Sequence, residues 1–275
     1  MPAILLYGAA FLLYAALAFH FWRTRWRGDR APDFARWERG AILLPLALHT
    51  WLVYDMLLAP GELRFGFGQA LSMMLWLAVI IYWVESRFLE VEGMQAPILA
   101  LAAVCVPLPA LFPGLASPSS AIAHSTELRL HLALAMIAYG LFTIAALHAL
   151  LMTLMERRLH GGALVGPLAA LPPLLTMERL LFRVLIAGFA FLTLTLVTGM
   201  VFSETLFGRA MRFDHKTVFA FASWIIFAAL LAGRHLYGWR GRTALRWTLA
   251  GFAALLLAYV GSRFVIEVIL RRGLV

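Results

Sequence analysis

Eight apolar runs dominate the sequence and constrain its fold more than any other feature. A helix that crosses the hydrocarbon core of a bilayer needs about 20 mostly apolar residues. The shortest run is the third. The runs are Pro2–Trp22, Ala41–Leu58, Gln69–Trp83, Ala96–Phe112, Leu128–Met155, Val184–Phe202, Thr217–Gly233 and Trp247–Leu270. They predict an all-α, polytopic integral membrane protein with eight transmembrane helices, forming a single transmembrane domain over residues 1–275.

The composition excludes a water-soluble enzyme. Apolar residues make up 63% of the chain and charged residues 13%, against about 45–50% and about 25% in soluble domains. Mean hydropathy is +0.87. The net charge of +9 does not indicate nucleic-acid binding, because lysine and arginine collect in the cytoplasmic loops of membrane proteins. We therefore expect the chain to lie in a lipid bilayer and to bind no nucleic acid.

The distribution of positive charge predicts the orientation. Six arginines separate the first two runs, and a cytoplasmic location for this loop fixes the other loops by alternation. The four cytoplasmic loops then hold 15 Lys and Arg residues, and the outer loops with the C-terminus hold 7. This asymmetry predicts both termini outside the cytoplasm. We expect a multi-pass protein of the bacterial inner (cytoplasmic) membrane.

No motif for covalent catalysis is present. Cys105 is the single cysteine, so the chain cannot form an internal disulfide or a CxxC redox pair. No phosphate-binding loop, HExxH, GxSxG or dinucleotide fingerprint occurs. We assign no covalent chemistry to the chain and expect that it is not an enzyme.

Two histidines at the predicted outer surface are the main candidates for cofactor binding. His131 begins the fifth run and His215 precedes the seventh, so both are expected at one depth, although 84 residues separate them. Imidazoles on separate helices, facing each other across a flat macrocycle, give the bis-histidine coordination of haem iron. A nearby carboxylate, Glu127 or Asp214, can orient each ring. The alternatives are an interhelical hydrogen bond for His131 and an ordinary loop position for His215.

Cations at the same end suit the two propionates of haem. The outer loop between the sixth and seventh runs carries Arg209, Arg212 and Lys216. Arg263 lies in the outer third of the last run. We expect the three arginines to neutralise the propionates of a bound haem b. Because Glu267 is four residues after Arg263, an ion pair on one helix is the alternative for this arginine.

His49 lies near the middle of the second run, where an ionisable residue is a functional candidate. It can be a reserve ligand for the iron, a proton-relay group or a hydrogen-bonded core residue. Asp55 follows on the same helix. These residues leave open a second alternative function, a small-solute or ion transporter in which His49, Asp55, Arg263 and Glu267 converge in one cavity.

Four segments in the C-terminal half carry a resemblance to a known family. They are Leu128–Leu151, Leu171–Phe202, Phe213–Leu231 and Gly238–Gly261. In order and spacing they resemble the CcsA/ResC membrane proteins of cytochrome c biogenesis, over about residues 128–270. His131 matches the first outer histidine of that family. Asp214 and Lys216 fall where the family has a WDPKET-like string, and His215 stands where the family has proline.

The loop Ser203–Asp214 contains no tryptophan, whereas the haem-handling members of the family carry a WGxxWxWD motif there. The chain is therefore most similar to the YpjD/HemX-like subgroup. The resemblance implies a membrane protein that binds or handles haem and assists cytochrome c assembly, with haem and other cytochrome c maturation proteins as partners. The missing tryptophans favour an alternative, a non-haem accessory protein that stabilises a transporter or a tetrapyrrole-pathway enzyme.

Overall fold

The computed structural model describes residues 2–27, 35–58, 64–88, 93–114, 125–160, 171–207 and 214–270. Within these ranges the chain forms helices joined by turns, and no β-sheet is present. The N-terminal helices are α1 (Pro2–Phe21), α2 (Ala35–Ala41), α3 (Leu43–Leu58), α4 (Phe67–Phe88), α5 (Gln95–Cys105) and α6 (Leu108–Leu111). The C-terminal helices are α8 (Thr126–His160), α9 (Leu174–Phe207), α10 (His215–Tyr237), α11 (Gly241–Leu256) and α12 (Ser262–Phe264). Three π-helical turns extend them, namely η1 (Trp22–Trp26), η3 (Leu257–Gly261) and η4 (Val265–Ile269).

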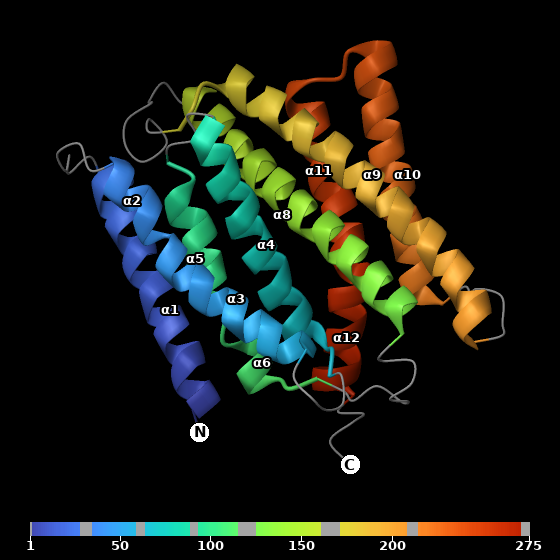
Figure 1. The fold of residues 1–275 in the computed structure, drawn as a ribbon. Coiled ribbons are helices and arrows are strands. Elements are labelled where there is room, and N and C mark those ends of the chain that lie inside the picture. Colours follow the sequence, from blue (N-terminus) through green and yellow to red (C-terminus); the bar gives the residue numbers. More distant parts are fainter. Residues whose placement is uncertain are drawn as a thin grey trace.

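The long helices run alternately up and down a bundle (Figure 1). Helices α4, α8 and α10 begin at the lower end of Figure 1, where α6, α9 and α12 also lie or end. The start of α1 and the end of the last helical segment lie at this same end. Below, "lower end" and "upper end" refer to this view.

Within the described ranges, seven helical segments are long and apolar enough to cross a membrane by length and composition. The third run, the shortest in the sequence, forms one of these segments, Phe67–Phe88. The fourth run is the exception, because Gln95–Leu111 is apolar but shorter. The chain is thus an all-helical, multi-pass membrane protein, and the eighth span remains a prediction.

A proline interrupts that shorter segment. Helix α5 ends at Cys105, and Pro107 precedes α6. Proline has no N–H to donate, and its ring clashes with the carbonyl one turn earlier, which breaks a helix. Helix α5 packs against α1 and α4, and with α6 it leads from the upper to the lower end (Figure 1).

Helix α9 begins at Leu174, earlier than the sequence predicts. The charges in this first part suggest a loop when the sequence is taken alone. In the structure, Nη1 of Arg234 on α10 lies 2.7 Å from Oε1 of Glu178. This ion pair between helices neutralises one of these charges and is compatible with a longer helix.

Helix α8 forms the centre of the bundle and packs against α4, α9 and α11. Phe142 of α8 stacks on Phe227 of α10, with ring centroids 3.9 Å apart and an interplanar angle of 13°. Gly251 of α11 is needed beside this pair, because a Cβ there would lie 2.8 Å from atoms of the Phe227 ring. Close packing at these three residues fixes the relative heights of α8, α10 and α11.

Candidate functional site

His131 lies in the first turns of α8, and its ring packs against α9. Nδ1 of His131 is 3.0 Å from Oγ1 of Thr198. A Cβ at Gly199 would lie 3.2 Å from Cε1 of His131, so the glycine lets the ring approach α9 closely. The sequence-based alternative, an interhelical hydrogen bond, is therefore present, and it occupies only one ring nitrogen.

Thr198 indicates which nitrogen of His131 carries the proton. Oγ1 of Thr198 is 2.8 Å from the carbonyl oxygen of Leu194 and 3.1 Å from that of Thr195. When this hydroxyl donates its single proton to either carbonyl, its oxygen accepts a hydrogen bond from Nδ1–H of His131. Nε2 then has a lone pair, which is the form of imidazole that binds a metal.

His215 lies at the same end of the bundle as His131. Helices α8 and α10 both begin at the lower end (Figure 1), and the stacked pair Phe142 and Phe227 relates their heights. His131 is 11 residues before Phe142 and His215 is 12 before Phe227. At 1.5 Å per residue these separations are about 17 and 18 Å. His215 is exposed, and among the described residues no hydrogen bond or ring contact joins it to His131.

Asp214 caps the start of α10. Its carboxylate accepts a hydrogen bond from the backbone N–H of Thr217 at 3.0 Å. Partial burial raises the pKa of Asp214, but the hydrogen bonds from Thr217 and the nearby charges of Lys216 and His215 outweigh it, so the pKa lies below its ordinary value of 3.8. Asp214 therefore orders the helix that presents His215.

Arg263 does not form the ion pair with Glu267 that is the alternative to propionate binding. Glu267 instead accepts a hydrogen bond from the backbone N–H of Phe67 at 3.4 Å, and no ion pair with Arg263 occurs among the described residues. Cζ of Arg263 lies 5.7 Å from the ring centroid of Tyr259. The π-helical turn η4 alters the spacing of successive turns, which changes how positions four residues apart are aligned.

Helix α12, which carries Arg263, and the start of α10, which carries Lys216, lie at the same end of the bundle (Figure 1). The hydroxyl of Tyr139 on α8 donates to the carbonyl of Leu255 on α11 at 2.6 Å. His131 is eight residues from this contact along α8, about 12 Å toward the lower end, and Arg263 follows Leu255 in the same direction along the C-terminal helix. Arg209 and Arg212 lie outside the described residues.

His49 is completely buried among α1, α3 and α4. Its Nδ1 is 3.3 Å from the hydroxyl of Tyr14, and its Nε2 is 3.0 Å from Oγ of Ser72. Both ring nitrogens therefore have protein partners, as in a hydrogen-bonded core residue. Asp55 is exposed.

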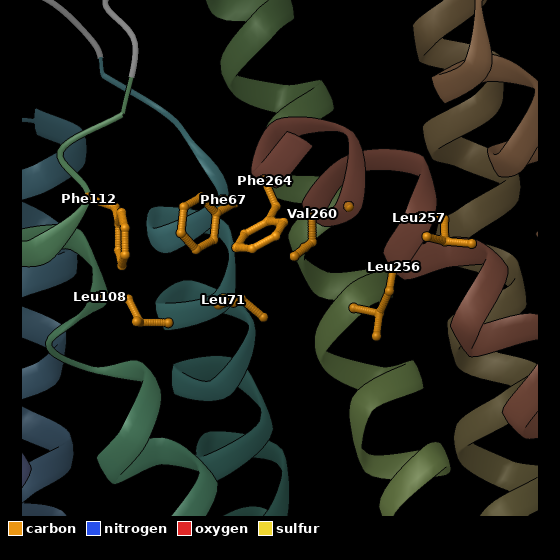
Figure 2. A pocket seen from close by; sticks show the side chains of 9 residues that line it. Phe67, Leu71, Leu108, Phe112, Leu256, Leu257, Val260 and Phe264 are labelled. Carbon is orange, nitrogen blue, oxygen red and sulfur yellow. The ribbon is translucent and has the colours of Figure 1, made fainter. Parts of the chain in front are cut away.

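An apolar cavity of about 440 Å³ separates α4 and α6 from the C-terminal helix (Figure 2). Its nine lining residues are Phe67, Leu71, Leu108, Phe112, Leu256, Leu257, Val260, Gly261 and Phe264. None of the four residues expected to converge in a transporter lines it. The described residues also contain no group of three or more His, Cys, Asp or Glu side chains that could hold a metal ion.

Sequence patterns did not identify Thr198 as the neighbour of His131 or Tyr259 as the neighbour of Arg263. No local signal identifies the phenylalanines of the cavity, because they come from three segments far apart in sequence. Pairing between helices, which a single sequence does not display, decides all of these contacts.

Comparison with known proteins identifies the family. The sequence model of the family described as cytochrome C assembly protein matches residues 41–270. The chain belongs to this family. The match begins well before residue 128, so it also includes helices α3 to α6, whereas α1 lies outside it. The resemblance seen in the C-terminal segments is confirmed.

Relatives in the cytochrome c assembly family include two groups. The inner membrane protein YpjD of Escherichia coli K12 is 34% identical over 155 residues, which are 55% of this chain and 58% of YpjD. A cytochrome c biogenesis protein CcsA of Prochlorococcus marinus is 35% identical over 88 residues, 32% of this chain and 28% of that protein. The chain thus spans somewhat more than half of YpjD and about a quarter of CcsA.

Proposed function

We propose that this protein binds haem b at the lower end of its bundle and assists cytochrome c assembly. Membership of the cytochrome c assembly family supports a role in cytochrome c biogenesis. The observation that carries the haem proposal is His131, whose Nδ1 is engaged by Thr198 while Nε2 retains a lone pair. A histidine ligand held through its second nitrogen is the usual arrangement at metal sites.

The described residues fit haem in donor type. His131 is the axial ligand and His215 the second, and bound iron supplies coordination and redox chemistry. Arg263 has a buried Nε without a hydrogen-bond partner in the described structure, a donor suited to a propionate. Arg209 and Arg212 are assigned the same task. His49 is the reserve ligand, although this role requires it to give up a bond to Tyr14 or Ser72.

The proposed setting is the bacterial inner membrane, as for the YpjD relative. We propose eight spans, with Gln95–Leu111 as the eighth, forming a single transmembrane domain over residues 1–275. An even number of spans places both termini on one side, and the charge asymmetry puts that side outside the cytoplasm. Haem and other cytochrome c maturation proteins are the proposed partners.

The non-haem accessory function is the second candidate, because the loop before Asp214 lacks tryptophan. It predicts a colourless protein that co-purifies with a transporter or a tetrapyrrole-pathway enzyme. The transporter alternative has less support, because none of its four residues lines the apolar cavity between α4, α6 and the C-terminal helix.

An absorption spectrum separates the candidates. The full chain is expressed with excess haem, purified in detergent and scanned for a Soret band. We expect a band in the wild type and its loss in His131→Ala. His235→Ala is the matched control, because His235 is exposed near the other end of α10. A colourless wild type, or an unchanged spectrum in His131→Ala, overturns the haem proposal.

A further inference from the structure

The exposed side of α9 forms one continuous stripe along the helix. Helix α9 packs mainly on α8 and α10, and it begins at the upper end of the bundle (Figure 1). Exposed residues recur every three or four positions, which is the spacing of one helix face. They are Leu175, Arg179, Arg183, Ile186, Ala190, Leu194, Val197 and Val201. The stripe is apolar except for its two arginines, which both lie near the upper end.

The uncharged stretch after Arg183 indicates where the hydrocarbon core of the membrane begins. Residues 184–202 contain no Asp, Glu, Lys or Arg. At 1.5 Å per residue this stretch is about 28 Å long, close to the thickness of the hydrocarbon core, about 30 Å. Arg183 therefore lies at the upper boundary of the core, and Arg179 lies one turn further out.

Tryptophans beside α9 indicate the same level independently. Nη1 of Arg234 on α10 contacts Glu178 of α9 and also donates to the carbonyl of Trp239 at 3.2 Å. The Trp239 ring packs on that of Trp247, with centroids 5.2 Å apart. Tryptophan is enriched at the membrane–water interface, where its amphipathic ring lies among the headgroups. Glu178 and the adjacent Arg179 are therefore at headgroup level.

The nearby carboxylate does not neutralise the two arginines of the stripe. Glu178 is engaged by Arg234, whose Cζ also lies 4.4 Å from the ring centroid of Phe182. Among the described residues, no ion pair involves Arg179 or Arg183. Their guanidinium groups are thus available to an external anion, and guanidinium pairs with phosphate through two parallel hydrogen bonds.

We propose that Arg179 and Arg183 bind the phosphate-bearing headgroup of an anionic phospholipid, whose acyl chain lies along Ile186, Ala190 and Leu194. The two arginines are four residues apart and so share one helix face with the apolar residues that follow. The orientation proposed above puts this end at the cytoplasmic leaflet, where anionic lipids attract basic side chains. The site goes beyond the proposed function and shares no residue with it.

The test is lipid retention by the full chain purified in detergent, measured by native mass spectrometry. The probes are phosphatidylglycerol and phosphatidylcholine with identical acyl chains, added at equal concentration. We expect the wild type to retain phosphatidylglycerol preferentially, and this preference to fall about tenfold or more in Arg179→Gln/Arg183→Gln. Arg240→Gln/Arg246→Gln is the matched control and should keep the preference, because it removes exposed arginines from the same end but not from α9.

Comparison of the two double variants decides whether the lipid binds on α9 or to any basic residue of the upper end. Equal losses in both double variants, or equal retention of the two phospholipids by the wild type, overturn the proposal. A dimer that dissociates in Arg179→Gln/Arg183→Gln also overturns it, because a second copy of the chain then covers the stripe. His131→Ala separates this site from the haem proposal, because this variant is expected to lose the Soret band and keep the phospholipid.

Discussion

The Thr198 hydroxyl of α9 and the His131 ring of α8 are joined by a 3.0 Å contact between Oγ1 and Nδ1. Because the hydroxyl proton is directed to the α9 backbone, Thr198 acts as an acceptor and leaves Nε2 of His131 available. The contact also links the two helices that pack most extensively in the bundle. A positioning role for Thr198 follows from this geometry.

Replacing Thr198 with valine is expected to weaken haem binding about 10- to 100-fold, the usual effect of losing the second partner of a histidine ligand. Haem titration followed at the Soret band gives the affinity. Thr198→Ser keeps the hydroxyl and is expected to retain most of the wild-type haem affinity. Thr195→Val is the control, because the Thr195 hydroxyl bonds only its own helix at Phe191. Equal losses in Thr195→Val and Thr198→Val would contradict the positioning role.

Gly251 is expected to be intolerant of any side chain. A Cβ there lies 2.8 Å from the Phe227 ring and 3.1 Å from Cγ2 of Ile226, so Gly251→Ala overpacks the core and costs about 1–3 kcal/mol. Thermal unfolding in detergent measures the loss. Gly8→Ala is the control, because a Cβ at Gly8 meets nothing within 4 Å and alanine favours the helix. A rise in Tm for both variants refutes this packing.

His49 is expected to contribute to the stability of the fold. Its removal in His49→Leu leaves the Tyr14 hydroxyl and the Ser72 hydroxyl without this partner in the core, at a cost of about 1–3 kcal/mol for each group left unsatisfied. Thermal unfolding should therefore show a clear fall in Tm, with the Soret band unchanged. A Soret band that shifts in His49→Leu instead supports its role as the reserve ligand.

The ionised Asp214 cap should make the stability of the fold depend on pH in the acid range. Its pKa is below 3.8 in the folded chain, so the ionised cap contributes stability above about pH 4, and this contribution is lost as the pH falls through the lowered pKa. Asp214→Ala is expected to cost about 0.5–2 kcal/mol at neutral pH and progressively less below pH 4. Unfolding curves from pH 7 to pH 3 measure the difference.

Asp214→Asn is the control for this prediction, because asparagine caps a helix well and does not ionise. Its stability at neutral pH should be close to that of the wild type. The loss of stability that titration of Asp214 causes at low pH should be absent. A difference between Asp214→Ala and the wild type that stays constant over the whole pH range excludes the titration of Asp214 as its cause.

The all-helical class and most of the spans were predictable because length and apolar composition decide whether a helix can cross a bilayer. The placement of His131 and His215 near the starts of two helices was also predictable, since each stands at the edge of an apolar run. The start of α9 was not predictable from the sequence, because the ion pair of Glu178 with Arg234 forms between two helices.

By itself, the sequence determined an apolar helical protein with its ionisable residues gathered toward the helix ends, since hydration of charge and burial of apolar surface act on every residue locally. Tertiary structure alone decided that His131 faces Thr198 and that Glu267 binds the start of α4. These outcomes depend on the rotation and register of packed helices. Those quantities are set by side-chain fit at contacts such as Phe142 with Phe227, which no periodicity within one helix specifies.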